Sequence, residues 1–542
     1  MHYMDEYHKW LSSPCLSSEQ KQELSTIEEK EIEDRFCAPL SFGTSGLRGV
    51  VGMGTNRMNV FSLLQAVRAF GKSLGENALA IVCRDVRPSS EEFSRIAACA
   101  LCEQGVRVLF FVRPSPTPML SFAVRHYGAS GGFNVTASHN PPEYNGCKFY
   151  GKTGAQLGDE DTSTVARIMA DIPVLAPLPQ STFDECLANG QITNIDCDEE
   201  YIEAVLRCRL DPQLLHNTDL RVVYSPFHGV GGGVTPEVFK RAGLKNVFCE
   251  PSQMIPDGRF TTLKNPNPED PAGFALSERL GRKVNADILV GTDPDSDRVA
   301  VCAKDKDGSY VCLTGNKTGA LLCYYMLRHY RGSKPPVIIK TIVSTHFAET
   351  ICESFGAKCY STFTGFKNMA EKMENLPDSE HCLMCFEESI GYMIGDHVRD
   401  KDGVSGALMV CEMAAWYKSR GMTLLDGLGE LDELYGVHDD YTINIVRRGV
   451  DGAEEIRDMM TYMRNSPPSS FCSQKVTEIR DYLTGLNTDL KGMNVLEYRL
   501  EGGSRVMIRP SGTEPKIKIY ALTKNLPPEA LARELEQRLA DR

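Results

Sequence analysis

The chain has no apolar run long enough to suggest a membrane span. Crossing a bilayer takes about 20 consecutive apolar residues, and no stretch of this sequence approaches that. The first residues, Met1-His-Tyr-Met-Asp-Glu6, lack the basic segment and following apolar segment of a secretory signal. We therefore expect a cytoplasmic protein with no membrane partner.

The chain also lacks an excess of positive charge. It has 59 Lys and Arg against 72 Asp and Glu, a formal net charge of −13. Binding to a nucleic acid backbone requires a basic surface, so we expect no nucleic acid partner. A small anionic ligand is not excluded, because a few local Arg, Lys and backbone N–H groups can bind it.

Two common nucleotide-binding motifs are missing. Ser41–Gly49 is rich in glycine but lacks the Gly-Lys-Ser/Thr ending of a P-loop. Gly229–Gly233 follows a predicted strand, yet Val234 occupies the last glycine position of the dinucleotide fingerprint. The sequence therefore gives no support for binding of ATP or a dinucleotide.

The 19 cysteines are scattered through apolar segments such as Ala98-Cys99-Ala100. In a long chain without a recognisable signal, this placement predicts buried, reduced thiols. Two C-x-x-C pairs occur, Cys99/Cys102 and Cys382/Cys385. We expect both pairs to pack in the core rather than bind zinc.

Hydrophobic patterning predicts several domains. A chain of 542 residues fits about three to five domains. Residues 1–40 form a predicted helical arm, with Ser17 and Gln20 in a capping box. From Ser41 onward, short apolar strands such as 79–83 and 286–290 alternate with helical patterns, which is typical of parallel or mixed sheets covered on both faces.

The C-terminal part has a different pattern. Residues 441–445 and 516–520 alternate between apolar and polar, which predicts half-exposed antiparallel strands. The expected fold is three similar mixed-sheet α/β domains and a smaller C-terminal α+β domain around one central cleft. The predicted domains are residues 1–205, 206–320, 321–438 and 439–542.

Ser138 and three aspartates stand out as candidates for chemistry. Ser138-His139 follows a strand pattern that ends at Val135. A serine in such a loop can be a nucleophile or carry a phosphate, although this loop taken alone could also be an ordinary turn. Asp293, Asp295 and Asp297 alternate through a second loop. Oxygen ligands at this spacing can converge on one cation, and Mg²⁺ suits such a site.

An EF-hand and a solvated acidic turn are two other interpretations of the aspartate loop. An EF-hand requires glycine at loop position six and glutamate at position twelve, where this chain has Arg298 and Lys304. The EF-hand is therefore rejected. A solvated acidic turn remains open on the evidence of this loop alone.

Two further loops offer groups that bind sugars and anions. Glu387-Glu388-Ser389 follows an apolar strand and could bind adjacent hydroxyls, although a surface charge cluster is the alternative. Arg509–Pro515 joins two strand-like segments and contains Ser511, Gly512 and Thr513. It could bind a phosphate, or it could be a plain hairpin turn.

Taken together, these loops resemble those of the α-D-phosphohexomutase superfamily. The resemblance runs from Trp10 nearly to the C-terminus. It is carried by Ser41–Gly49, Thr136–Pro142, Tyr144–Lys148, Gly291–Arg298, Thr364–Lys367, Glu387–Ser389 and Arg509–Pro515. The opening segments resemble the phosphoglucomutase/phosphopentomutase branch most. Cys385 and Phe366 depart from the expected residues, Gly and Trp, and bear on substrate preference.

The resemblance implies a mechanism and a set of residue roles. Ser138 would carry a phosphoryl group, and Asp293, Asp295 and Asp297 would bind Mg²⁺ together with Ser138. The other implied catalytic residues are Arg48, Lys148, His139, His397 and Lys401. The implied substrate-binding residues are Thr364, Glu387, Ser389, Arg298, Arg509, Ser511, Gly512 and Thr513.

The implied activity is intramolecular phosphoryl transfer between sugar 1-phosphate and 6-phosphate, with a sugar 1,6-bisphosphate as activator. Glucose is the first choice of sugar, and mannose and pentose phosphates stay open. A metal-dependent phosphatase and a sugar-phosphate-binding regulator are the alternatives. The oligomeric state stays open between monomer and dimer.

Overall fold

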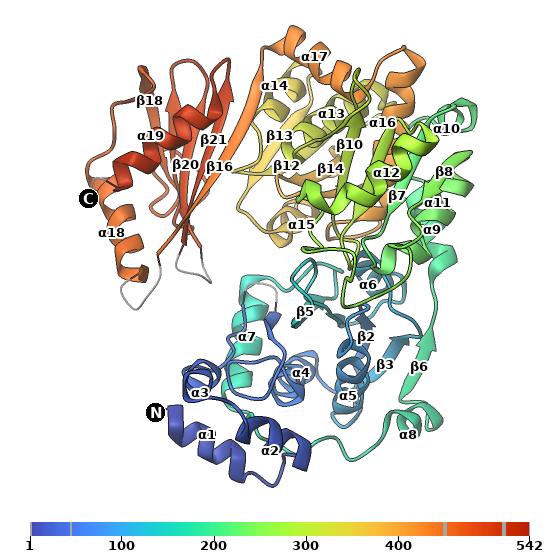
Figure 1. Ribbon diagram of the computed structural model, residues 1–542, viewed down its shortest axis with the longest axis vertical. Helices are drawn as coiled ribbons and strands as arrows, with labels where there is room; N and C mark the ends of the chain where they lie inside the picture. The colour runs from blue at the N-terminus through green and yellow to red at the C-terminus, as the bar shows by residue number, and fades with distance from the viewer. Residues whose placement is uncertain (1–2, 44–45, 448–451, 512–515, 541–542) are drawn as a thin grey trace. The chain divides into compact units, whose positions relative to one another are not determined.

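A computed structural model describes residues 3–43, 46–447, 452–511 and 516–540 of the chain. These residues form two compact units, one of Met1–Cys312 with Gly391–Ser419 and one of Leu313–Ile390 with Arg420–Arg542 (Figure 1).

The first unit begins with three short helices, α1 (Tyr3–Ser12), α2 (Ser18–Ser25) and α3 (Glu29–Phe36). The predicted capping box is present: the Ser17 hydroxyl accepts from Gln20 N, and Ser17 N donates to the Gln20 side chain. Trp10 is fully buried against Phe36 and Phe61. The predicted helical arm is therefore confirmed, and it packs on the first sheet's core.

The first sheet has the strand order β1-β5-β4-β2-β3-β6. Its strands are β1 (Gly46–Val50), β2 (Leu79–Arg84), β3 (Arg107–Phe111), β4 (Gly131–Val135), β5 (Tyr144–Gly151) and β6 (Ile192–Ile195). Its helices are α4 (Val60–Leu74), α5 (Ser90–Cys102), α6 (Thr117–His126), α7 (Asp159–Ala170) and α8 (Phe183–Ala188). β2 is parallel to β3 and β4, and β5 is antiparallel to β4 and β1. This sheet is mixed, as predicted.

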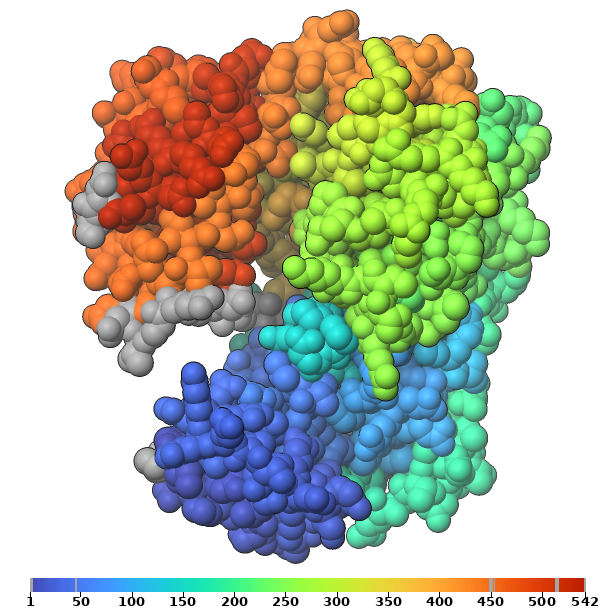
Figure 2. All heavy atoms as spheres, viewed as in Figure 1, coloured from blue at the N-terminus to red at the C-terminus, as the bar shows by residue number. Residues whose placement is uncertain are grey.

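The second sheet of this unit has the order β11-β10-β9-β7-β8. Its strands are β7 (Arg221–Ser225), β8 (Asn246–Cys249), β9 (Ile288–Thr292), β10 (Val299–Lys304) and β11 (Tyr310–Cys312). The accompanying elements are α9 (Asp198–Leu206), α10 (Pro212–Asn217), η1 (Val230–Gly233), α11 (Thr235–Arg241), η2 (Pro271–Phe274), α12 (Ala275–Val284), β15 (Gly391–Ile394) and α16 (Gly403–Ser419). In Figure 2 the green atoms of this part lie against the blue and cyan atoms of the first sheet's part. The Arg87 guanidinium, for example, lies 5.1 Å from the centre of the Phe260 ring.

One pair of cysteines departs from the expectation of reduced thiols. Cys302 on β10 and Cys312 on β11 form a disulfide. Antiparallel pairing places these two residues directly opposite each other, a juxtaposition that their spacing in the sequence does not reveal. The expectation was therefore wrong for this pair. The four C-x-x-C thiols are buried, two on α5 and two on β14 (His381–Glu387) of the second unit.

The second unit contains a parallel sheet and an antiparallel sheet. In the parallel part, β12 (Pro336–Thr341) lies between β13 (Lys358–Thr362) and β14. Its helices are α13 (Gly315–His329), α14 (Phe347–Ser354), α15 (Phe366–Glu374) and α17 (Leu424–Tyr435).

The antiparallel sheet has the order β16-β21-β20-β19-β18-β17. Its strands are β16 (His438–Val446), β17 (Ser470–Phe471), β18 (Gln474–Asp481), β19 (Leu496–Leu500), β20 (Arg505–Pro510) and β21 (Lys516–Lys524), with helices α18 (Gly452–Asn465) and α19 (Pro528–Ala540). Leu531, Leu535 and Leu539 of α19 are buried in its core. The predicted fold class, three α/β domains followed by an α+β domain, is confirmed by these sheets.

The helices are short or carry polar faces. α16, the longest and most apolar of them, is still interrupted by Glu412 and packs against β9, β10 and β15. Across the part of the chain that the structure describes, no helix has both the length and the apolar character for a bilayer crossing.

Candidate active site

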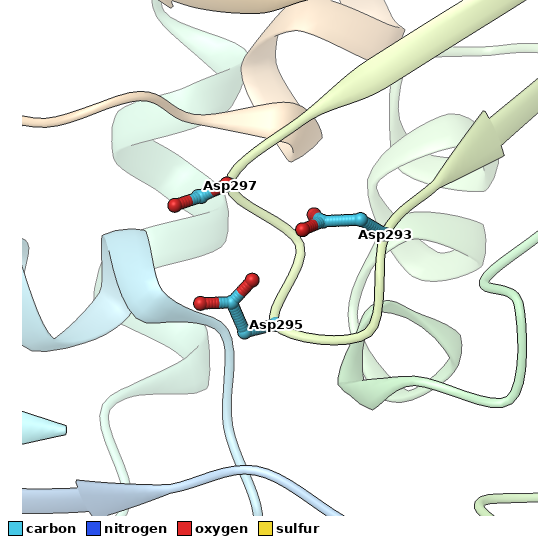
Figure 3. A group of neighbouring side chains, drawn as sticks. All are labelled: Asp293, Asp295 and Asp297. Atoms are coloured by element: carbon cyan, nitrogen blue, oxygen red, sulfur yellow. The ribbon is translucent and has the colours of Figure 1, made fainter. Parts of the chain in front are cut away.

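Asp293, Asp295 and Asp297 gather in the loop between β9 and β10. One carboxylate oxygen from each aspartate lies within 4.8 Å of the other two, and the three residues are 0–1% exposed. Figure 3 shows the carboxylates converging from one tight loop. The loop is closed by hydrogen bonds from Asp293 N to Arg298 O and from Ser296 N to Asp293 O, which bring alternate side chains to the same side.

The carboxylate oxygens are suited to a divalent cation. Lys148 Nζ donates to Asp295 Oδ2 at 2.8 Å and to Asp297 Oδ2 at 2.9 Å. The Oδ1 atoms of Asp295 and Asp297 are buried and accept no hydrogen bond from the described residues, although Arg298 Nε lies 3.8 Å from the latter. Buried oxygens without donors are costly, and hard cations such as Mg²⁺ take such oxygens as ligands. The residues present therefore fit this metal.

The three carboxylates do not titrate alike. Burial and the neighbouring Asp295 and Asp297 charges hold the pKa of Asp293 well above its ordinary value. Burial also disfavours the charged form of Asp295, yet the Lys148 ammonium lowers its pKa below the usual range. A bound cation would offset the repulsion among the three, because opposite charge favours the ionised form.

Ser138 lies directly beside this loop. It follows β4, and its hydroxyl donates to Asp293 Oδ2 at 2.9 Å and lies 3.2 Å from His139 Nδ1. The serine has a φ of 49°, which is uncommon for a residue other than glycine, and Ser138 N donates to the Thr136 hydroxyl. Two loops at the carboxyl ends of β4 and β9 thus meet, as expected for ligand sites of α/β sheets.

Arg87 fixes the serine loop and was missed from the sequence. Its guanidinium donates to four backbone carbonyl oxygens of that loop, those of Ser138, Asn140, Pro141 and Tyr144, at 2.6–2.8 Å. Its Nε donates to Asp85 Oδ2 at 3.1 Å. The available signal was an Asp-x-Arg sequence directly after a predicted apolar strand.

Cationic side chains surround the aspartates. Lys401 Nζ lies 3.4 Å from Asp297 Oδ2 and 3.2 Å from Asp400 Oδ1. Arg48 on β1 has an exposed side chain that donates to Asn140 Oδ1 at 2.9 Å. Arg298 lies next to the loop and 3.5 Å from Glu269. The structure therefore brings Arg48, Lys148, Arg298 and Lys401 to one region with Ser138.

His139 and His397 differ in their surroundings. Burial and the nearby Arg298 and Arg48 charges keep the pKa of His139 well below its ordinary value, so its ring is neutral beside the Ser138 hydroxyl. His397 Nε2 lies 2.8 Å from Asp402 Oδ2 and its Nδ1 lies 3.7 Å from Cys208 Sγ. Asp402 in turn accepts from Val404 N and Ser405 N at the start of α16. This geometry gives His397 a structural partner rather than contact with the serine.

The remaining predicted site residues belong to the second unit. Arg509 Nη1 donates to the Thr364 hydroxyl, and Ser511 N donates to Lys516 O. Glu387 and Ser389 flank the end of β14 and are half-buried. Gly512 and Thr513 lie outside the described residues.

Glu388, between two predicted residues, was not singled out from the sequence. Its Oε2 accepts from the hydroxyls of Thr341 and Ser344 at 3.2 and 3.3 Å. Burial and the Glu387 charge raise its pKa. These bonds hold the Glu387–Ser389 turn at the end of β12. Only the order of strands in the sheet shows that β12 helps to position this turn.

Family comparison covers most of the chain. Models described as phosphoglucomutase/phosphomannomutase match in four parts: alpha/beta/alpha domain I at residues 39–174, domain II at 199–308, domain III at 314–433 and the C-terminal domain at 473–541.

Individual relatives agree with the family match. The phosphoglucomutase of Staphylococcus aureus strain N315 is 32% identical over 527 residues, which cover 92% of each chain. The structure of a Thermus thermophilus protein assigned as a phosphomannomutase superposes with a TM-score of 0.71 at 25% identity, covering 93% of this chain and all of that one. Paramecium parafusin, a phosphoglucomutase solved in an open form, has the same fold, with a TM-score of 0.72 at 18% identity over 93% and 95% of the two chains. The chain therefore belongs to the phosphoglucomutase/phosphomannomutase family.

Proposed function

We propose that this protein is a phosphohexomutase that interconverts the 1-phosphate and 6-phosphate of a sugar, glucose first, through a phosphoserine at Ser138. The observation that carries the proposal is the 2.9 Å hydrogen bond from the Ser138 hydroxyl to Asp293, within the group of three aspartates. Family membership and the identity to a curated phosphoglucomutase support the same reaction.

Mg²⁺ would be held by Asp293, Asp295, Asp297 and an oxygen on Ser138, and when bound it supplies positive charge for the transferring phosphoryl group. Phosphoryl transfer depends mainly on positioning and charge neutralisation. Arg87 supports this by fixing the serine loop through its carbonyls. The buried Lys148 orients two of the three carboxylates.

Four cationic or basic groups are assigned to the phosphoryl group that is transferred and to the hydroxyls that exchange it. Arg48 and Lys148 would stabilise the phosphoryl oxygens, and Lys401 would exchange a proton with the sugar hydroxyl. His139, neutral and 3.2 Å from the Ser138 hydroxyl, would accept the proton of that hydroxyl when the phosphoserine forms. His397 would act indirectly, through Asp402 and the segment that carries Lys401.

The second unit is assigned the recognition of the sugar and of the non-reacting phosphate. Glu387 and Ser389 would bind sugar hydroxyls, and Arg509, Ser511 and Thr364 would bind the phosphate, together with Gly512 and Thr513. Arg298, in the metal loop of the first unit, is a further proposed substrate-binding residue. A sugar 1,6-bisphosphate would serve as the intermediate and activator, since its two phosphates exchange roles at one serine.

The direct test follows the products of glucose 1-phosphate incubated with Mg²⁺ and glucose 1,6-bisphosphate. We expect glucose 6-phosphate as the main product and a phosphoserine at Ser138 by mass spectrometry. Ser138→Ala should abolish both, while Ser163→Ala, at an exposed serine of α7, should leave both unchanged. Inorganic phosphate as the main product would indicate a phosphatase instead.

The same assay ranks the sugars. Mannose 1-phosphate and ribose 1-phosphate, compared with glucose 1-phosphate by kcat/KM, separate a glucose-preferring mutase from a phosphomannomutase or phosphopentomutase. Faster turnover of either alternative would replace glucose in the proposal and leave the phosphoserine mechanism intact.

A further inference from the structure

Thr117 connects the start of α6 to the aspartate loop. It is fully buried, and it makes two hydrogen bonds to one residue 178 positions away: Thr117 N donates to Asp295 O at 2.8 Å, and Thr117 Oγ1 donates to Asp295 Oδ2 at 2.7 Å. One residue of the first sheet's part therefore fixes both the backbone and the side chain of Asp295.

Asn134 sets the direction of the hydroxyl proton. Its Nδ2 donates to Thr117 Oγ1 at 2.7 Å, and its side chain is fully buried on β4. Because the Thr117 oxygen accepts this amide hydrogen, its own hydrogen points to Asp295 Oδ2. The result is a directed chain from Asn134 through Thr117 to the carboxylate, and such chains strengthen each bond within them.

These hydrogen bonds determine which oxygen of the Asp295 carboxylate is available to bind a cation. Oδ2 accepts from both Thr117 and Lys148, at 2.7 and 2.8 Å. Oδ1 is buried and accepts from none of the residues described. Two donors on one oxygen fix the plane of the carboxylate, so that the other oxygen is presented with the remaining aspartates.

We infer that Thr117 and Asn134 are positioning residues that orient Asp295 for a divalent cation, and that removal of the Thr117 hydroxyl weakens cation binding. The inference rests on the proposed metal site, and it concerns residues outside that ligand set. Hydrogen-bond partners of metal ligands typically change metal affinity by about 10–100-fold when they are mutated.

The substitution Thr117→Val isolates the hydroxyl. Valine keeps the branched shape of threonine and the backbone bond from residue 117 to Asp295 O. It loses both bonds of the hydroxyl, the one donated to Asp295 Oδ2 and the one accepted from Asn134 Nδ2. Thr117→Ser keeps the hydroxyl and serves as the rescue variant. Ser94→Ala is the matched control, because Ser94 is a buried helical hydroxyl on α5 that donates to Glu91 O.

The test is calorimetric titration of Mg²⁺ and Mn²⁺ into the full-length protein after removal of metal with EDTA. We expect Thr117→Val to bind about 10–100-fold more weakly than the wild type, and Thr117→Ser and Ser94→Ala to stay within about 3-fold. Circular dichroism and urea unfolding identify variants that do not fold. If Thr117→Val is among them, Thr117→Ala, which has no bulk beyond Cβ to accommodate, takes its place.

Two results would overturn the inference, and they differ in whether the proposed metal site survives. Equal affinities of the wild type and Thr117→Val would overturn the positioning role alone and leave the metal site standing. A wild type that takes up neither cation would overturn the role together with the metal part of the proposed function.

Discussion

Replacement of Lys148 by methionine gives the sharpest test of the site's electrostatics. The Lys148 ammonium is nearly buried and lies 2.8 and 2.9 Å from the carboxylates of Asp295 and Asp297. Burial alone would lower its pKa, but the two carboxylates raise it, so the group is charged. Methionine fills a similar volume and removes the charge.

The magnitude follows from the distances. At an effective dielectric constant of about 20, each contact near 3 Å contributes about 5–6 kcal/mol of attraction. The desolvation of the ammonium costs several kcal/mol and offsets part of this. Loss of one partner of a buried ion pair typically costs about 3–5 kcal/mol, because the remaining charge is left uncompensated. We therefore expect Lys148→Met to lose about that much unfolding free energy in EDTA.

Urea unfolding at pH 7 measures the effect, with EDTA and with MgCl₂. Binding of any ligand at about 100 times its Kd raises the free energy of unfolding by roughly 2.7 kcal/mol. Mg²⁺ should raise that of Lys148→Met by more than this, because the cation also supplies the missing positive charge. Lys152→Met, at an exposed lysine just after β5, should change stability little under both conditions. A loss below about 1 kcal/mol for Lys148→Met in EDTA, the size of a surface ion pair, would refute a buried charge between the aspartates.

Three further predictions concern other parts of the site. Burial lowers the pKa of His397, but Cys208 and Asp402 together raise it to about 10. The charged ring therefore stabilises the folded protein fully below the unfolded pKa of about 6.5, and this stabilisation is lost as the pH rises through 10. His397→Gln should accordingly cost about 3 kcal/mol at pH 6 and little at pH 10 in urea unfolding, and an equal cost at both values would contradict the charged ring. Arg87→Lys cannot supply the forked donors to the serine loop, so kcat should fall about 100-fold in the mutase assay; an unchanged kcat would show that the loop holds its geometry without them. Arg509→Lys should raise KM for glucose 1-phosphate about 10-fold and affect kcat less; a fall in kcat at constant KM would assign Arg509 to the chemical step instead.

Local patterns were sufficient to single out the serine and the three aspartates that the structure brings together. Ser138 and the three aspartates follow short apolar strands, and that placement depends only on neighbouring residues. The capping box at Ser17 and the antiparallel strands near the C-terminus follow from equally short patterns. The same reasoning did not find Arg87. Its bonds run to backbone carbonyl oxygens, so the side chains of the serine loop do not indicate it, and the Asp-x-Arg sequence alone does not show which loop the arginine contacts.

The sequence by itself determined which hydroxyl and carboxylate oxygens each loop carries and how they are spaced, because these are properties of single loops. The tertiary structure decided which of these groups meet. Ser138 and Asp293 are 155 positions apart, and Thr117 contacts Asp295 only because the start of α6 lies against the loop between β9 and β10. It also decided that His397 faces Asp402 and that Cys302 is joined to Cys312. Such contacts depend on strand order and register, which are set by the burial of the whole core rather than by the residues that finally touch.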